Sequence, residues 1–303
     1  MASGIASGGV TMRWTGEAGR LEVWYTTITD PTTGTGFWLH SELVAPKDGT
    51  EAFVHGWAAV FPPDRQPVWE RFGPSLVADE PTELVGSAGT LHWDLRITDG
   101  GGPTLYTFPR YAWERQLLPA AQVVPAPAAV YAGTFNVAGK TFDLTGARGA
   151  TARIYGHGNA KRWGWLHADL GDGDVLEIVS AVSTRPGLAQ LPPITLLQLR
   201  VDGRDLSRDP LLAAPLLRAR LRLPEWQVRG VVGRRRIGVQ VHQDPERTVA
   251  IQYTDPDGAT ATCHNSEVAS VDLRLEKLSR GRWVLDRQWH LDRTAHAEIG
   301  VRP

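Results

Sequence analysis

The chain has 303 residues, of which 42% are hydrophobic and 21% are charged, and its formal net charge is −1. This balance is typical of a globular protein, and the overall charge does not favour nucleic acid or an anionic membrane surface as a partner. The single cysteine, Cys263, excludes an internal disulfide framework and a cysteine-based zinc site.

Short strands separated by turn residues dominate the predicted secondary structure. Asp-Gly pairs such as Asp48-Gly49 and Asp172-Gly173 mark the turns. The one helical pattern covers residues 209–221, where Pro215 should interrupt it. Many short strands at this spacing are typical of a sandwich or a barrel. The main predicted strands, in chain order, are Leu21–Thr29, Gly36–Val44, Ala52–Phe61, Leu91–Thr98, Lys140–Thr145, Ala150–Tyr155, Gly164–Leu170, Val175–Val182, Ile194–Val201, Trp226–Val232, Arg236–His242, Thr248–Tyr253, Val268–Lys277 and Trp283–Trp289.

An internal repeat indicates a duplicated unit. The segment Trp38-Leu39-His40-Ser41-Glu42-Leu43 has a counterpart in Trp165-Leu166-His167-Ala168-Asp169-Leu170, and a glycine turn, an apolar strand and a Pro-Pro pair follow both copies. The repeat predicts two domains, 1–125 and 126–303, with the Pro/Ala-rich stretch Pro119–Ala129 as their connector. Because an antiparallel sheet of about eight strands can close around one small ligand, we predict an all-β fold of two lipocalin-like antiparallel β-barrel domains packed side by side.

Two short motifs resemble a known family. The run from Gly156 to Ala168, Gly-His-Gly-Asn-Ala-Lys-Arg-Trp-Gly-Trp-Leu-His-Ala, is similar to the second-domain signature of the tandem lipocalin-like group, and Val23-Trp24-Tyr25 followed by Phe37-Trp38 is similar to its first-domain marker. This group includes tocopherol cyclases, carotenoid 1,2-hydratases, AttH-like proteins and lipocalin-like Diels–Alderases. The family segment often carries an acidic residue and a histidine before Trp-Gly, whereas here only His157 could take that polar position.

The resemblance implies two barrels, a hydrophobic substrate and chemistry without a cofactor, such as alkene protonation, hydration or pericyclic closure. On this basis we expect a cofactor-independent cyclase, hydratase or isomerase acting on a lipophilic isoprenoid or polyketide in a Trp-lined pocket. The expected catalytic residues are His167, Asp169 and His157. The expected substrate-binding residues are Trp163, Trp165, Tyr155, Trp38, His40, Glu42 and Trp57.

Strand alternation brings the aromatic, histidine and carboxylate side chains of the repeated motif onto one face of each strand. It places Trp38, His40 and Glu42 on one face of a strand, and Trp163, Trp165, His167 and Asp169 on one face of another. A carboxylate beside a histidine and an apolar wall could act as an acid/base unit, and indole faces could stabilise a cation. Two alternatives remain open. In one, the leucines point inward and these polar groups lie in solvent; in the other, the His–carboxylate pairs are structural and lie between the two halves.

Other polar residues are weaker candidates by pattern. His55 and Trp57 share a strand face with Phe53, where a histidine is usually a hydrogen-bonded core residue. Cys263, Asn265 and Glu267 would share a face, as would His296 and Glu298, and a structural role is the expectation for both sets. No histidine pair has the spacing of a helical metal site, so no metal is predicted.

An alternative function uses the same pocket without chemistry. The protein would then be an intracellular carrier or sensor of a hydrophobic small molecule, and a third reading is a domain pair that binds another protein. No apolar stretch is long enough to span a bilayer, and Met1–Gly9 lacks the pattern of a secretory signal, so we expect a cytoplasmic protein. The expected partner is a lipophilic small molecule, and the sequence leaves the oligomeric state open.

Overall fold

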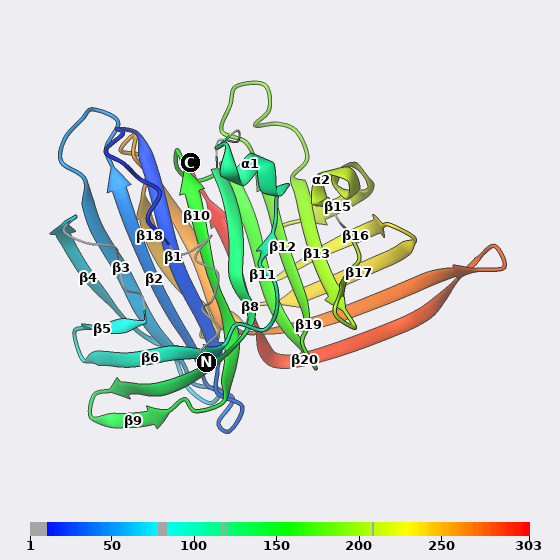
Figure 1. Ribbon diagram of the computed structural model, residues 1–303, viewed down its shortest axis with the longest axis horizontal. Coiled ribbons are helices and arrows are strands. Elements are labelled where there is room, and N and C mark those ends of the chain that lie inside the picture. The colour runs from blue at the N-terminus through cyan, green and yellow to red at the C-terminus, as the bar shows by residue number, and fades with distance from the viewer. Residues whose placement is uncertain (1–10, 78–83, 117, 119, 208) are drawn as a thin grey trace, which may run out of the picture.

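The computed structural model describes residues 11–77, 84–116, 118, 120–207 and 209–303, which form two large antiparallel sheets side by side (Figure 1). In the described residues the first sheet has the strand order β4-β3-β2-β1-β10-β8-β6-β5, with β7 and β9 paired to β8. Its strands are β1 (Arg20–Thr29), β2 (Gly36–Ala45), β3 (Phe53–Phe61), β4 (Val68–Leu76), β5 (Val85–Ala88), β6 (Leu91–Asp99), β7 (Leu105–Tyr106), β8 (Ala120–Val137), β9 (Lys140–Asp143) and β10 (Ala147–Gly156).

The second sheet has the order β14-β13-β12-β11-β20-β19-β17-β16-β15, with β18 paired to β19. Two short helices, α1 (Arg110–Glu114) and α2 (Pro210–Ala213), and the 3₁₀ turns η1 (Ala214–Leu216) and η2 (Pro245–Arg247) complete the described elements. The strands are β11 (Arg162–Gly171), β12 (Asp174–Val182), β13 (Ile194–Val201), β14 (Arg204–Asp205), β15 (Leu217–Arg220), β16 (Glu225–Val232), β17 (Arg235–His242), β18 (Val249–Thr254), β19 (Thr260–Ser279) and β20 (Arg282–Val301).

The predicted fold class is confirmed: the protein is all-β, with two lipocalin-like halves packed side by side. The helical pattern over 209–221 gives only α2 and η1 before β15 begins, as Pro215 indicated. The predicted domain boundary at residue 125 stays a prediction, and it falls within β8. Hydrogen bonding divides the two sheets between β10 and β11. Residues 120–129 of the expected connector belong to β8, whereas Pro119 lies outside the described residues.

The strand order corrects the alignment of the internal repeat. β1 pairs with β2 and β10, and β11 pairs in the same manner with β12 and β20. β11 therefore corresponds to β1, so the matching segments in β2 and β11 occupy different places in their sheets. Both strands have one face toward their own sheet's core and one toward the other sheet, and this shared requirement accounts for their similar alternation.

Apolar clusters lie both within each half and between the two halves. Each sheet curves around its own cluster, which contains Leu39 in the first half and Leu166 in the second. A further cluster joins Trp38 and Trp57 of the first sheet to Tyr253 of β18, and another packs Tyr25 with Trp165. Side chains on both faces of β2 and β11 are therefore buried, which brings polar residues of both strands into the space between the sheets.

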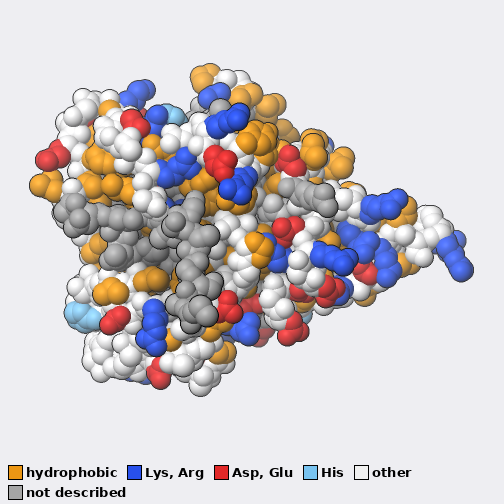
Figure 2. Space-filling model, in the orientation of Figure 1, with side chains coloured by type: hydrophobic (Ala, Val, Ile, Leu, Met, Phe, Trp, Pro, Cys, Tyr) orange, Lys and Arg blue, Asp and Glu red, His pale blue; other side chains and the backbone are white. Residues whose placement is uncertain are grey.

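A long hairpin of β19 and β20 projects from the body of the molecule (Figure 1). Lys and Arg side chains gather on it, as Figure 2 shows. Among the described residues, none of the helices combines the length and the apolar composition that crossing a membrane requires.

Candidate functional site

An inner cavity of about 150 Å³ lies between the two sheets. Its wall combines apolar side chains with a few polar groups, which is typical of a small-molecule site. The aromatic part of the wall comes from both sheets. The aromatic and polar lining residues used below are Tyr25, Trp38, His40, Glu42, Gln122, Trp163, Trp165, Tyr253 and Glu298.

Glu42 lies between two histidines. His40 Nε2 is 3.0 Å from Glu42 Oε1, and His55 Nε2 is 3.2 Å from Oε2. Arg71 Nη2 lies 3.1 Å from His55 Nδ1, and because a guanidinium only donates, that nitrogen accepts and the His55 proton is on Nε2, facing Glu42. Burial alone would raise the pKa of Glu42, but the hydrogen bonds and charges of the two histidines outweigh it and lower the pKa to about 2. Glu42 is therefore an anion at neutral pH.

Glu298 of β20 has the opposite electrostatic environment. The Trp163 indole N–H donates to its Oε1 at 2.6 Å, and the Cys263 thiol donates to its Oε2 at 3.2 Å. Burial raises the pKa of Glu298, although these two bonds oppose the shift. The inner cavity therefore has two carboxyl groups whose pKa values are shifted in opposite directions, downward for Glu42 and upward for Glu298.

The phenols and the thiol beside Glu298 are held in their neutral forms. Burial, together with nearby carboxylates, raises the pKa of Tyr25 and Tyr253 well above 10 and that of Cys263 well above 9. His40 stacks on Tyr253 with ring centroids 5.1 Å apart, and Trp38 lies 4.9 Å from the same imidazole. An aromatic wall therefore surrounds the acid–base groups of the inner cavity.

A second polar unit is centred on Glu177 of β12. His167 Nδ1 lies 2.9 Å from Glu177 Oε2, and Trp165 Nε1 donates to Oε1 at 2.6 Å. Gln122 of the first sheet donates to the same Oε1 at 2.6 Å and to the Tyr25 hydroxyl at 2.8 Å. This unit therefore joins the two sheets and supplies Gln122, Tyr25 and Trp165 to the cavity wall.

A third buried unit lies at Glu267 of β19. His296 Nδ1 is 2.7 Å from Glu267 Oε2, Asn265 Nδ2 donates to Oε1 at 3.1 Å, and Thr27 of the first sheet also donates to this carboxylate. Thr29 Oγ1 lies 3.3 Å from His296 Nε2. Glu267 and His296 do not line the inner cavity. Their contacts with Thr27 and Thr29 instead connect the two sheets through polar groups.

The structure separates the residues expected to act together. His167 contacts Glu177, while Asp169 accepts a hydrogen bond from the Gly171 amide and lies 3.6 Å from Arg148. His157 is exposed outside the inner cavity, and its Nδ1 is 2.7 Å from Arg20 Nη1. His167 and Asp169 therefore do not form a pair in this structure.

The expected substrate-binding residues also divide into two groups. Trp163, Trp165, Trp38, His40 and Glu42 all line the inner cavity. Trp57 packs behind this wall against His55 and Tyr253, at ring distances of 4.9 and 5.2 Å, and Tyr155 lines a separate small cavity with Trp113. The reading that placed the polar residues of β2 in solvent is wrong for His40 and Glu42, which are 6% and 1% exposed.

Sequence reasoning gave little weight to Glu298 and did not single out Glu177, Gln122 or Tyr253. A weak signal was present for two of them. Glu177 is the only charged residue between Val175 and Val182, and Glu298 alternates with His296 in an apolar segment. Gln122 and Tyr253 have no local signal, because their importance depends on contacts between the two sheets.

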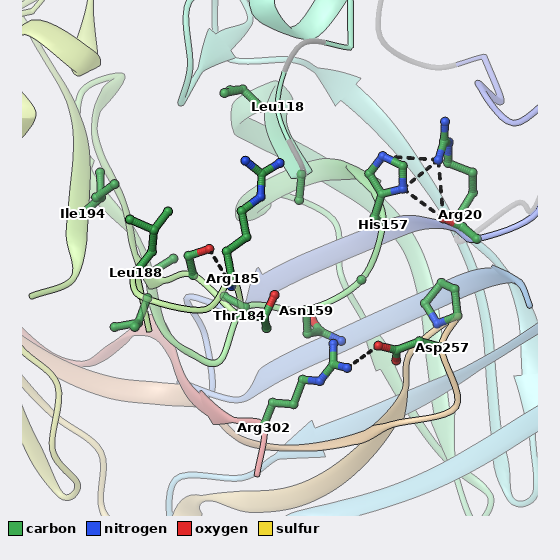
Figure 3. A pocket seen from close by; sticks show the side chains of 18 of the residues that line it. Arg20, Leu118, His157, Asn159, Thr184, Arg185, Leu188, Ile194, Asp257 and Arg302 are labelled. Atoms are coloured by element: carbon green, nitrogen blue, oxygen red, sulfur yellow. Dashed lines mark hydrogen bonds and ion pairs between the residues drawn. The ribbon is translucent and has the colours of Figure 1, made fainter. Parts of the chain in front are cut away.

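A larger outer cavity of about 630 Å³ continues from the inner one, since residues such as Phe108, Asn159 and Val179 line both. Figure 3 shows its wall, with Leu188 and Ile194 on one side and the Arg20–His157 contact on the other. Within the described residues, no group of three or more His, Cys, Asp or Glu side chains is arranged to hold a metal ion.

A family model described as tocopherol cyclase-like matches residues 100–301. The uncharacterised protein Rv0493c of Mycobacterium tuberculosis is 49% identical over 306 residues, which cover 96% of this chain and 89% of that protein.

Similar solved structures share the fold at low sequence identity. CghA with Sch210972 has a TM-score of 0.53 at 15% identity, covering 93% of this chain and 88% of that one. Kievitone hydratase from Nectria haematococca has a TM-score of 0.55 at 11% identity, with coverage of 92% and 88%. An AttH-like protein from Nitrosomonas europaea has a TM-score of 0.52 at 13% identity, with 92% of each chain covered. By its family match, the chain belongs to the tocopherol cyclase-like family.

Proposed function

We propose that this protein is a cofactor-independent cyclase, hydratase or isomerase that protonates a double bond of a lipophilic isoprenoid or polyketide in the inner cavity. The observation that carries the proposal is the pair Glu298 and Glu42. Both carboxyl groups line one cavity, yet their environments move their pKa values in opposite directions. Two titratable groups separated in this manner are typical of an acid and a base that act on the same substrate.

Glu298 is the proposed acid. Its proton passes to one carbon of the double bond and leaves a positive charge on the other carbon. Trp38, Trp163 and Tyr253 line the same cavity as Glu298, and an aromatic face that meets a desolvated cation stabilises it by about 2 kcal/mol. The Trp163 N–H and the Cys263 thiol then stabilise the carboxylate that remains.

His40 and Glu42 are the proposed base. A hydroxyl group of the same substrate, or a water molecule, forms a C–O bond to the cation and loses its proton to His40, whose other nitrogen contacts Glu42. Loss of a proton from a carbon next to the cation would instead give an isomer. Proton exchange with solvent returns Glu298 and His40 to their starting states.

His167 has a supporting role in this scheme. Its contact with Glu177 holds the carboxylate that fixes the Trp165 indole and the Gln122 amide in the cavity wall. Asp169 contacts a turn and His157 lies at the outer cavity, so neither is proposed as a proton donor to the substrate.

The test follows solvent deuterium into the product. The purified protein is incubated in D₂O with a panel of prenylated hydroquinones and linear polyenes, and products are analysed by mass spectrometry. We expect an isomeric or hydrated product with one carbon-bound deuterium. Glu298→Gln should lower its rate of formation by roughly 10²- to 10⁴-fold while the substrate still binds. Glu51→Gln, at an exposed residue outside the cavities, is the matched control.

Two results would count against the proposal. A product whose rate of formation does not change in Glu298→Gln would remove Glu298 from the chemistry. Binding of panel members to the wild-type protein with no turnover of any of them would instead favour a carrier.

A further inference from the structure

The outer cavity has a basic wall and an apolar wall. Among the described residues, four basic side chains (Arg20, Lys47, Arg185 and Arg302) and a single acid, Asp257, line it. The apolar wall includes Leu188, and the Arg185 side chain extends between Leu188 and Arg20 in Figure 3. Since the whole chain has a net charge of −1, this excess of positive charge is local to the cavity.

One of the four cations is already neutralised. Arg302 contacts Asp255 at 2.9 Å and also pairs with Asp257. Within the described part of the chain, Arg20, Lys47 and Arg185 form no ion pair with an acidic side chain. Three basic side chains therefore line the cavity without any described acidic side chain at ion-pair distance, and the charge of Glu17 acts on Arg20 from beyond that distance.

The Arg20 side chain is held in place by its neighbours. Its Nη1 contacts His157 Nδ1 at 2.7 Å and the Gly19 carbonyl at 3.5 Å. Both ring nitrogens of His157 lie within hydrogen-bond distance of this Nη1, at 2.7 and 3.2 Å, and because the guanidinium can only donate, the nitrogen that bonds it accepts. A guanidinium held in this manner loses less conformational entropy when it binds an anion.

We propose that the substrate carries an anionic end group, a carboxylate or a phosphate ester, which binds in the outer cavity against Arg20, Lys47 and Arg185. The lipophilic chain of the same molecule extends along the shared wall into the inner cavity, toward Trp163 and Glu298. This inference rests on the proposed function and names the class of its substrate: an amphipathic lipid with one anionic end. Binding of that end fixes which double bond reaches the acid.

Retinoids with one chain and three different ends provide the test. All-trans-retinol, all-trans-retinoic acid and retinyl phosphate share an isoprenoid skeleton, and their binding is followed by quenching of tryptophan fluorescence at pH 8. In low salt we expect both anions to bind about tenfold more tightly than retinol. The advantage should decrease at 0.5 M NaCl, because salt screens exposed charges. Tighter binding of retinoic acid would indicate a carboxylate site, and tighter binding of retinyl phosphate would indicate a phosphate site.

Charge reversal identifies the residues responsible. The double variant Lys47→Glu and Arg185→Glu should bind retinol as the wild type does and should lose the preference for both anions. Arg234→Glu, at the exposed turn between β16 and β17, is the control and should keep the preference.

Three outcomes would overturn the inference. Equal binding of all three retinoids would contradict the inference of an anionic end group, and so would a preference for anions that persists in the double variant. Neither result would contradict the proposed function. Failure of all three, retinol included, to bind would contradict the proposed function and with it this inference.

Discussion

Trp163 and Glu298 are joined by an indole-to-carboxylate hydrogen bond of 2.6 Å across the β11–β20 pair. Trp163 lies directly opposite Gly300 in the register of these strands, and the ring covers that glycine. The position of Glu298, the proposed acid, therefore depends on Gly300, which lies two residues further along β20 and leaves room for the Trp163 ring because it has no side chain.

Gly300→Ala should disturb this arrangement. A Cβ at Gly300 would overlap the Trp163 ring, so the ring must move and its bond to Glu298 must lengthen or break. Overpacking of this kind costs about 1–3 kcal/mol, measured as the free energy of unfolding in urea. Gly238→Ala on β17 is the matched control, because a Cβ there meets no heavy atom within 4 Å. Equal stability of the two variants would contradict the prediction.

Glu42 should make the folded state sensitive to acid. Its pKa in the folded protein, about 2, lies below the ordinary value of 4.5, so its stabilising contribution is present above pH 4.5 and is lost as the pH falls toward 2. Between pH 5 and pH 3 the wild type should lose about 2 kcal/mol more unfolding free energy than Glu42→Gln. Urea titrations at several pH values measure both proteins, and parallel curves would show that the prediction is wrong.

Glu298 should have the opposite pH dependence. Its pKa is raised by burial, so the folded state is favoured by protonation of this group, and stability is lost as the pH rises from 4.5 through the folded-state pKa. Glu298→Gln cannot ionise and avoids this loss. The stability of the variant relative to wild type should therefore increase between pH 4 and pH 9, measured by the same titrations. A constant difference across this range would contradict the assigned direction.

The Cys263 thiol should be unreactive in the native protein. It is fully buried, and burial together with the charge of Glu298 raises its pKa well above 9. At pH 8 we expect the aromatic disulfide reagent DTNB to label the native chain at least about a hundredfold more slowly than the urea-unfolded chain. The unfolded protein should release one equivalent of thiolate, because Cys263 is the single cysteine. Rapid stoichiometric labelling of the native protein would disprove this.

Strand periodicity was enough to place the right residues on the same face. The alternation in β2 correctly put Trp38, His40 and Glu42 together, and His40 does contact Glu42. The same reasoning could not find the partner of His167. Glu177 lies directly opposite His167 in the β11–β12 register, whereas Asp169 is two residues along the same strand and has a shorter side chain. The partner of a side chain on a neighbouring strand depends on the register between the two strands, and the residue pattern of a single strand does not specify that register.

The Pro/Ala-rich stretch shows a different limit of sequence reasoning. Proline usually excludes a central strand, so a connector was the natural expectation. In the structure β8 pairs with β10 through two register shifts, between Gly149 and Thr151 and between Thr151 and Arg153. Irregular pairing of this kind tolerates a missing N–H donor, which explains how a strand containing Pro125 and Pro127 lies inside the sheet.

β18 has a consequence for the modular exchange of halves between relatives. This strand is hydrogen-bonded to the second sheet, yet its Tyr253 stacks on His40 and contacts Trp57 of the first. In a chimera with its first half from one family member and its second half from another, the residue at position 253 and the residues at positions 40 and 57 would come from different parents. Their aromatic packing would then no longer match. We therefore expect such a chimera to fold only when residues 249–254 come from the same parent protein as β2 and β3.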